Sequence, residues 1–250
     1  MSADITTHAI VLRRRDSGES DRRLTLFTQE FGVIETVAKG ARKGGSRLAG
    51  VTEPLTVGTF QMAKGKARSY ITQVQPLTSF PKLRSDYDRM LLALAIAELA
   101  AVILPHEERS DDSFRFVLQA IHYLEIAENA LAAFLWAECK LMAIAGFQPS
   151  WTECVVTGQT ISENPAWVSP QAGGYVALGS ETGFSDRFAA PAEALIAAEK
   201  IQELDIPPAS VKFLSESVRL VIRFWMTFAD DPLPTHRAVM DQLLASNSGA

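Results

Sequence analysis

Short runs of apolar residues, each ended by a turn, make up the first eighty positions of the chain. The runs are rich in β-branched and aromatic residues and alternate with polar positions, which is typical of β-strands. The pattern predicts strands at residues 8–12, 22–28, 33–38, 55–62 and 69–74, with a short helical turn within 46–53. Five strands with the longest interruption after the third favour an OB-fold barrel, although an SH3-like barrel gives a similar pattern.

Apolar residues recur at helical spacing from Asp86 onward. Helices are expected between Asp86 and Pro105, along the apolar stripe from Phe114 to Leu124, and from the capping residue Asn129 to near Gly146. Further helices are expected at residues 191–204, 209–228 and 236–244, with Phe213 on the apolar side of the second of these.

A small irregular insert is expected at residues 147–190, which are rich in proline and glycine and contain short β-like pieces at 167–168 and 175–178. The whole pattern predicts an α+β protein. An N-terminal five-stranded OB-fold barrel occupies residues 1–80, and a mainly helical C-terminal domain that carries the insert occupies residues 81–250.

Charge is divided unevenly along the 250 residues. The net charge is −5, but residues 1–80 hold twelve Lys and Arg against seven Asp and Glu, and residues 81–250 hold twelve against twenty-two. A locally basic segment can bind nucleic acid in a protein that is acidic on average. The sequence contains no apolar run long enough to span a membrane, no secretory signal pattern and only two cysteines, so we expect a cytoplasmic protein.

The most basic stretch is Val37–Arg47, which we call the basic loop; it carries four cations, three glycines and no acid. Such a loop is suited to phosphate contacts, although it could equally be a solvated loop that binds nothing. We favour its own cations Lys39, Arg42, Lys43 and Arg47 as phosphate contacts, since one loop can present them together. The wider set of candidates adds Arg13, Arg14, Arg22, Arg23, Lys64, Lys66 and Arg68.

Four aromatic residues of the expected barrel, Phe27, Phe31, Phe60 and Tyr70, are candidates for a platform on which bases stack. The alternative for each is that it fills the barrel interior. Alternation along a strand allows only some of these residues to reach solvent.

Sequence signatures of common catalytic sites are missing. There is no GxxxxGK phosphate loop, no GxSxG elbow and no HExxH, and the four histidines are scattered. We therefore predict that the protein is not an enzyme and has no catalytic residues and no metal site.

An ordered set of motifs resembles the RecO family of bacterial DNA repair and recombination mediators. In the first part these are Gly18-Glu19-Ser20-Asp21, Leu24–Thr28, Val37–Arg42 and Ser46–Gly50. A second group follows at Gly146-Phe147, Cys154–Gly158, Val168–Pro170 and Gly173-Gly174. The resemblance implies an OB-fold followed by a helical domain, the division predicted above.

The resemblance also implies function and partners. It implies binding to single- and double-stranded DNA, annealing of complementary strands, and work with RecR to help load RecA onto DNA coated with single-strand-binding protein. The C-terminal tail of that protein is an expected partner of the helical domain, with Arg115, Lys140, Arg219 and Arg223 as available cations. RecF is a further candidate partner, and the protein is expected at the nucleoid. An RNA-binding OB-fold protein is the alternative, and an enzyme with an unrecognised site is the third hypothesis.

One departure from the family pattern concerns zinc. Many relatives carry two CxxC pairs in the insert, whereas here Cys154 is the single cysteine at those positions; Thr157 stands at the second position and residues 177–180 contain none. Structural zinc needs four ligands. The insert is therefore expected to be a degenerate zinc ribbon without zinc, held by packing of Trp151, Trp167 and Tyr175.

Overall fold

The computed structural model describes residues 4–65, 68–229 and 231–247. It separates into two compact units, Met1–Glu125 and Ile126–Ala250. The first unit extends past residue 80, where the sequence predicts a domain boundary. The boundary at residue 80 therefore stays a prediction.

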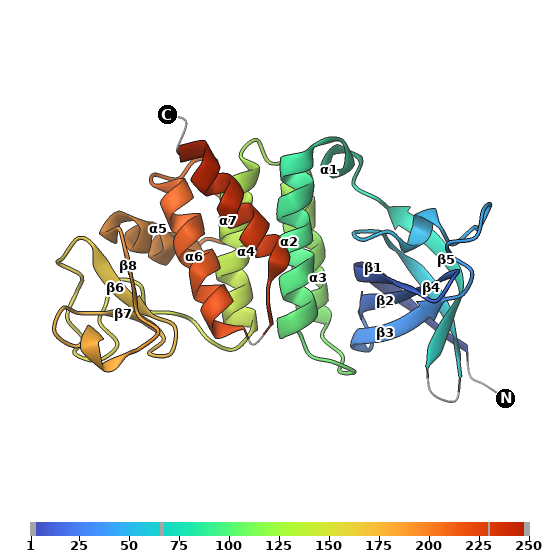
Figure 1. The fold of residues 1–250 in the computed structure, drawn as a ribbon, viewed down its shortest axis with the longest axis horizontal. Coiled ribbons are helices and arrows are strands. Elements are labelled where there is room, and N and C mark those ends of the chain that lie inside the picture. Colours follow the sequence, from blue (N-terminus) through green and yellow to red (C-terminus); the bar gives the residue numbers. More distant parts are fainter. Residues whose placement is uncertain (1–3, 66–67, 230, 248–250) are drawn as a thin grey trace. The chain divides into compact units, whose positions relative to one another are not determined.

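Five strands close into a barrel in the order β1-β2-β3-β5-β4 (Figure 1, blue to cyan). They are β1 (Asp4–Ser17), β2 (Asp21–Thr28), β3 (Gly32–Ala38), β4 (Val57–Lys64) and β5 (Ser69–Thr78). Neighbouring strands are antiparallel except β3 and β5, which meet in a short parallel pair. This order, with the 3-10 turn η1 (Gly50–Thr52) between β3 and β4, confirms the predicted OB-fold.

Alternate residues of the strands point into the barrel and form its core. The core holds Ala9, Val11, Leu24, Leu26, Ala38, Ala41, Phe60, Met62 and Ile71. The opposite face of β1 and β2 is also apolar where helices cover it, and Ile10, Leu12 and Phe27 are buried there. Double-sided burial explains why these strands contain unbroken apolar runs rather than strict alternation.

Three helices complete the first unit: α1 (Pro81–Ser85), α2 (Tyr87–Ile103) and α3 (Asp111–Ile126). The ring of Phe114 on α3 packs edge-on against Phe27, with ring centroids 5.5 Å apart. The carboxylate of Glu125 accepts hydrogen bonds from the backbone N–H groups of Lys82 and Leu83, at 3.0 and 2.8 Å, and so caps α1.

Four helices form the frame of the second unit: α4 (Ala130–Ile144), α5 (Ala192–Gln202), α6 (Leu214–Phe228) and α7 (Pro234–Asn247). Asn129 caps α4 as predicted, since its side-chain oxygen accepts a hydrogen bond from the N–H of Ala132 at 3.1 Å. Buried aliphatic and aromatic residues of α4 and α6 form the core of this unit.

The insert contains a small sheet in the order β7-β6-β8, drawn in yellow in Figure 1. Its strands are β6 (Ala166–Ser169), β7 (Gly174–Val176) and β8 (Phe188–Ala190), and the 3-10 turn η2 (Glu181–Gly183) lies between β7 and β8. Trp151 is buried, lies edge-on to Phe224 with centroids 5.3 Å apart, and donates its indole N–H to Gln202 at 3.1 Å. Tyr175 is also buried, but Trp167 is half-exposed beneath the Arg187 guanidinium.

The prediction that a helix begins at Ala209 with Phe213 on its apolar side is wrong. Helix α6 begins at Leu214, and Phe213 precedes it with a positive φ of 56° and a 48% exposed side chain. The carbonyl of Phe213 accepts the first helical hydrogen bond, from the N–H of Ser217 at 2.9 Å. A residue in the left-handed region cannot continue a helix backward, so the segment after Pro207-Pro208 stays irregular.

Candidate nucleic-acid interface

The basic loop is fastened to the turn between β1 and β2. The N–H of Gly40 donates to the carboxylate of Asp21 at 2.8 Å, and the N–H of Arg42 donates to the carbonyl of Ser20 at 2.9 Å. Ala41 lies between them and is fully buried in the barrel core. The loop backbone is therefore held in place, and its cationic side chains lie on the exposed side.

The four cations of this loop differ in their surroundings. Arg42 forms an ion pair with Asp16 at 3.3 Å and donates to the carbonyl of Gly18 at 3.1 Å. The ammonium of Lys39 lies 4.1 Å from the ring centroid of Tyr70, a cation–π contact. Within the described part of the chain, no ion pair joins Lys43 or Arg47 to an acid, and both are exposed. These two carry the least neutralised charge of the loop.

Arg22 is buried rather than available to a phosphate. It donates to the carbonyl of Ala49 at 2.7 Å and to the hydroxyl of Thr52 at 2.8 Å, and it pairs with Glu53 at 3.2 Å. Arg14 also pairs with Glu53, at 3.1 Å. Both arginines thus link the barrel to η1 and the residue after it; Arg22 is buried by these contacts, whereas Arg14 remains exposed.

The outward face of β2 carries Arg23, whose side chain is exposed. Its direct neighbour on β1 is Arg15, which is exposed as well and was absent from the candidate contacts. On the other side Arg23 is paired with Val37 of β3, and Val37 with Tyr70 of β5. A row of paired positions therefore crosses four strands, with arginines on β1 and β2, a valine on β3 and an aromatic ring on β5.

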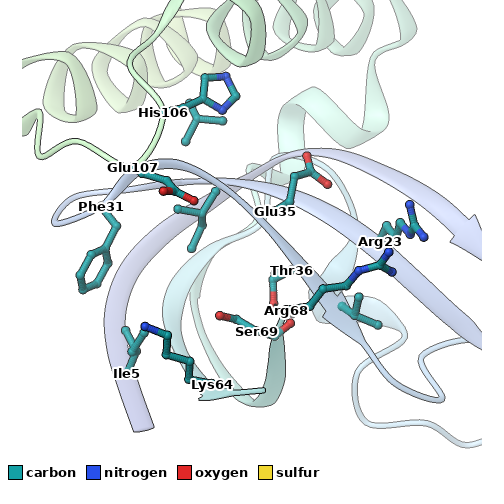
Figure 2. A pocket seen from close by; sticks show the side chains of 13 residues that line it. Ile5, Arg23, Phe31, Glu35, Thr36, Lys64, Arg68, Ser69, His106 and Glu107 are labelled. Atoms are coloured by element: carbon teal, nitrogen blue, oxygen red, sulfur yellow. Dashed lines mark hydrogen bonds between the residues drawn. The ribbon is translucent and has the colours of Figure 1, made fainter. Parts of the chain in front are cut away.

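A groove of about 730 Å³ opens beside this row (Figure 2). Three candidate contacts, Arg23, Lys64 and Arg68, line it together with the exposed ring of Phe31. The apolar lining is completed by Ile5, Val33, Ile34 and Val37, and the polar lining by Glu35, Thr36, Ser69, His106 and Glu107. Cations and apolar surface in one groove are what a single nucleic-acid strand requires.

The predicted stacking platform is only partly available. Phe27 and Phe60 are fully buried, so neither can meet a base. Phe31 is 37% exposed and lines the groove, and Tyr70 is half-buried beneath Lys39. Of the remaining candidates, Arg13 donates to the carbonyl of Glu98 at 3.0 Å, and Lys66 lies outside the described residues.

A second hollow, of about 350 Å³, lies in the Ile126–Ala250 unit between α5 and the segment that precedes α6. Its walls are mainly apolar and include Ile196, Leu204 and Phe213, and its charged lining residues are Lys200, Lys212 and one acid, Glu193. These two lysines are not among the cations expected from the sequence. Of the expected cations, Arg219 pairs with Glu216 at 3.4 Å, Arg223 lies over Phe188, and Arg115 pairs with Asp112.

The residues of the insert do not fit a structural zinc ion. The sulfur of Cys154 accepts hydrogen bonds from the backbone N–H groups of Ala177 and Thr157, at 3.2 and 3.4 Å. Within the described residues no group of three His, Cys, Asp or Glu side chains is placed to hold a metal. Burial alone would raise the pKa of Cys154, but hydrogen bonds from Thr157, Ala177 and Val156 outweigh it and lower the pKa.

Among the described residues, no helix is long and apolar enough to cross a bilayer.

Comparison with known proteins identifies the family of the chain. The family described as "Recombination protein O N terminal" matches residues 1–80, and "Recombination protein O C terminal" matches residues 84–224. The DNA repair protein RecO of Desulfitobacterium hafniense (strain DSM 10664 / DCB-2) is 36% identical over 174 residues, which are 70% of this chain and 63% of that protein. This chain thus spans slightly less than two thirds of that relative's length.

A second relative matches along nearly its whole length. The DNA repair protein RecO of Dehalococcoides mccartyi (strain ATCC BAA-2266 / KCTC 15142 / 195) is 29% identical over 252 residues, covering 98% of each chain. Together with the barrel, the helices that follow it and the family matches, these similarities show that the chain belongs to the RecO family of DNA repair and recombination proteins.

Proposed function

We propose that this chain is a recombination mediator that binds single- and double-stranded DNA through the basic side of its barrel and anneals complementary strands. The observation that carries the proposal is the groove lined by Arg23, Lys64, Arg68 and the exposed ring of Phe31. Point charges contact phosphates without regard to sequence, and an aromatic face can stack on any base. Such a surface also screens the repulsion between two strands, which helps complementary bases to pair.

The basic loop and the groove support one another as parts of a wider contact surface. Lys39 lies over Tyr70, and Tyr70 is paired with Val37, which lines the groove. A strand that occupies the groove could therefore continue onto the exposed cations Lys43 and Arg47. Duplex DNA is too wide to place its bases in the groove. It would therefore contact the exposed cations alone.

The proposed action requires protein partners. Working with RecR, the protein would help load RecA onto DNA coated with single-strand-binding protein. We propose that the hollow beside α5 receives the C-terminal tail of single-strand-binding protein, because apolar walls and the lysines Lys200 and Lys212 suit an acidic peptide with an apolar end. Binding and annealing need no bond-making chemistry, so we propose no enzymatic activity.

The test is annealing of complementary DNA strands that are coated with single-strand-binding protein, with and without this chain. We expect the wild-type chain to accelerate annealing and the variant R23E/R68E to lose most of the acceleration. The matched control is Lys82→Glu, which reverses an exposed cation at the start of α1, outside the groove. No acceleration by the wild-type chain, or equal losses in both variants, would contradict the proposal.

RNA oligomers of the same base sequence, with uracil in place of thymine, distinguish the alternative of an RNA-binding protein, because the 2′-hydroxyl lets a protein tell RNA from DNA. A clear preference for RNA in direct competition would favour that alternative over a DNA mediator.

A further inference from the structure

The loop between α2 and α3 is attached to β3 at the groove. The N–H of Val33 donates to the carbonyl of Pro105 at 2.9 Å, and the N–H of Glu107 donates to the carbonyl of Val33 at 3.3 Å. His106 bridges to Gly32 and Val33 in the same way as a short added strand. The loop thereby places His106 and Glu107 in the wall of the groove.

Gly32 permits this close approach. A Cβ atom at this position would lie 2.4 Å from the carbonyl oxygen of Glu108 and 2.5 Å from that of Pro105, and the φ of Gly32 is +60°. Glu107 itself adopts a φ of 57°, which is uncommon for a residue with a side chain. Backbone pairing therefore holds Glu107 in a defined place, rather than on a freely moving loop.

The groove consequently has two kinds of charged wall. In Figure 2, Glu35, His106 and Glu107 lie along one side, on β3 and the α2–α3 loop, and Lys64 and Arg68 lie on the opposite side, at the ends of β4 and β5. The carboxylate of Glu35 accepts a hydrogen bond from the hydroxyl of Thr25, its cross-strand neighbour, which fixes its orientation. Two carboxylates weaken phosphate binding unless the ligand offers them hydrogen-bond donors.

A single DNA strand offers donors on the side away from its phosphates. Cytosine, adenine and guanine carry exocyclic amino groups, and a carboxylate is a natural acceptor for the amino group of cytosine. Thymine has one ring N–H between two carbonyl oxygens, which repel a carboxylate. In a duplex the base edges are already paired and phosphates lie on both sides. A duplex therefore cannot place phosphates at the cationic wall and free amino groups at the acidic wall at the same time.

We propose that Glu35 and Glu107 are specificity-determining residues that accept hydrogen bonds from base amino groups while Arg23, Lys64 and Arg68 hold the phosphates. The inference rests on the proposed function, since it assigns the orientation of a strand in the same groove. The groove then prefers single strands whose bases carry amino groups over oligothymidine.

The experiment compares binding of oligo(dC) and oligo(dT) of equal length at one salt concentration and at mildly alkaline pH, where cytosine is unprotonated. We expect the wild-type chain to bind oligo(dC) about fivefold more tightly. In the variant E35Q/E107Q the affinities for oligo(dC) and oligo(dT) should become equal, because an amide both donates and accepts hydrogen bonds. The two affinities should also rise, because two negative charges are removed from the groove. Circular dichroism checks that each variant is folded.

Glu19→Gln is the matched control, since it removes one exposed carboxylate on the β1–β2 turn, outside the groove. It should leave the ratio of the two affinities unchanged. Equal wild-type affinities, or a preference that persists in E35Q/E107Q, would overturn the inference and leave the proposed function intact. The variant R23E/R68E tests the phosphate contacts, and it should weaken the binding of both oligomers by the same factor. If the wild-type chain binds neither oligomer, the proposed function itself is overturned.

Discussion

Arg15 of β1 and Arg23 of β2 stand directly opposite each other on the exposed side of the barrel. Like charges at directly opposed positions destabilise a pair of strands. The arrangement is favourable only when an anion neutralises it, and DNA phosphate is the anion that the proposed function supplies. Stability and binding should therefore respond to these arginines in opposite directions.

Replacing Arg15 with Ala should raise the free energy of unfolding by up to about 1 kcal/mol, because the cross-strand repulsion is removed. The same variant should bind single-stranded DNA more weakly, with a salt slope reduced by about 0.7 if one phosphate contact is lost. Denaturant unfolding and a salt titration of binding measure the two effects. Arg14→Ala, which breaks the ion pair with Glu53, should instead lower the free energy of unfolding and leave the DNA affinity unchanged.

Arg22→Ala should destabilise the protein by on the order of 3 kcal/mol, since it leaves buried partners of a charged group unsatisfied. The guanidinium of Arg22 bonds Thr52 and pairs with Glu53, and both interactions would be lost. Thermal unfolding gives the measurement. A variant with wild-type stability and weakened DNA binding would show that Arg22 is a contact residue after all.

The triple variant R42E/K43E/R47E reverses three charges of the basic loop. It should weaken the binding of single-stranded DNA and lower the slope of log affinity against log salt concentration by up to about 2. Lys43→Glu alone should cost more affinity than Arg42→Glu alone, because Asp16 already neutralises Arg42 in part. Binding is measured at several salt concentrations. Affinity and slope equal to those of the wild-type chain would exclude this loop from the interface.

The hollow beside α5 is tested with a peptide that carries the C-terminal sequence of single-strand-binding protein. The double variant K200E/K212E should lower the affinity for the peptide by about tenfold or more, because an acidic ligand loses both cations. Arg237→Glu, on the exposed surface of α7, is the matched control. If the control loses as much affinity as the double variant, the attraction comes from overall charge and not from this hollow.

Cys154 should contribute stability in a pH-dependent way. Its pKa is lowered in the folded chain, so the contribution is fully present above the ordinary thiol pKa of about 8.5 and is lost as pH falls through the folded value. Cys154→Ala should therefore lower the unfolding temperature more in alkaline buffer than in mildly acidic buffer. A deficit that is independent of pH would show that the thiolate is not stabilised by Ala177 and Thr157.

Metal analysis of protein purified without a metal-affinity tag tests the expected absence of zinc. We expect far less than one zinc per chain, since Thr157 and Ala177 surround Cys154 and supply no ligand atoms of the usual kind. Near-stoichiometric zinc would refute this expectation.

Much of the fold could be predicted because its signals are local. Strand β2 was expected at 22–28 and spans Asp21–Thr28, and Asn129 caps α4 as its position before an apolar helix suggested. Phe213 was misplaced because its left-handed backbone depends on the packing of the irregular segment before α6, which helical periodicity does not register.

The amino-acid sequence by itself determined the order of strands and helices and the concentration of positive charge in the barrel half, because both follow from neighbouring residues. Only the tertiary structure decided which cations pair with an acid. Consecutive strand residues point to opposite faces, so Arg14 and Arg22 pair with Glu53 while Arg15 and Arg23 lie exposed on the other face. It also brought Glu107 to β3 through backbone hydrogen bonds, which depend on chain path and leave no pattern in the side chains.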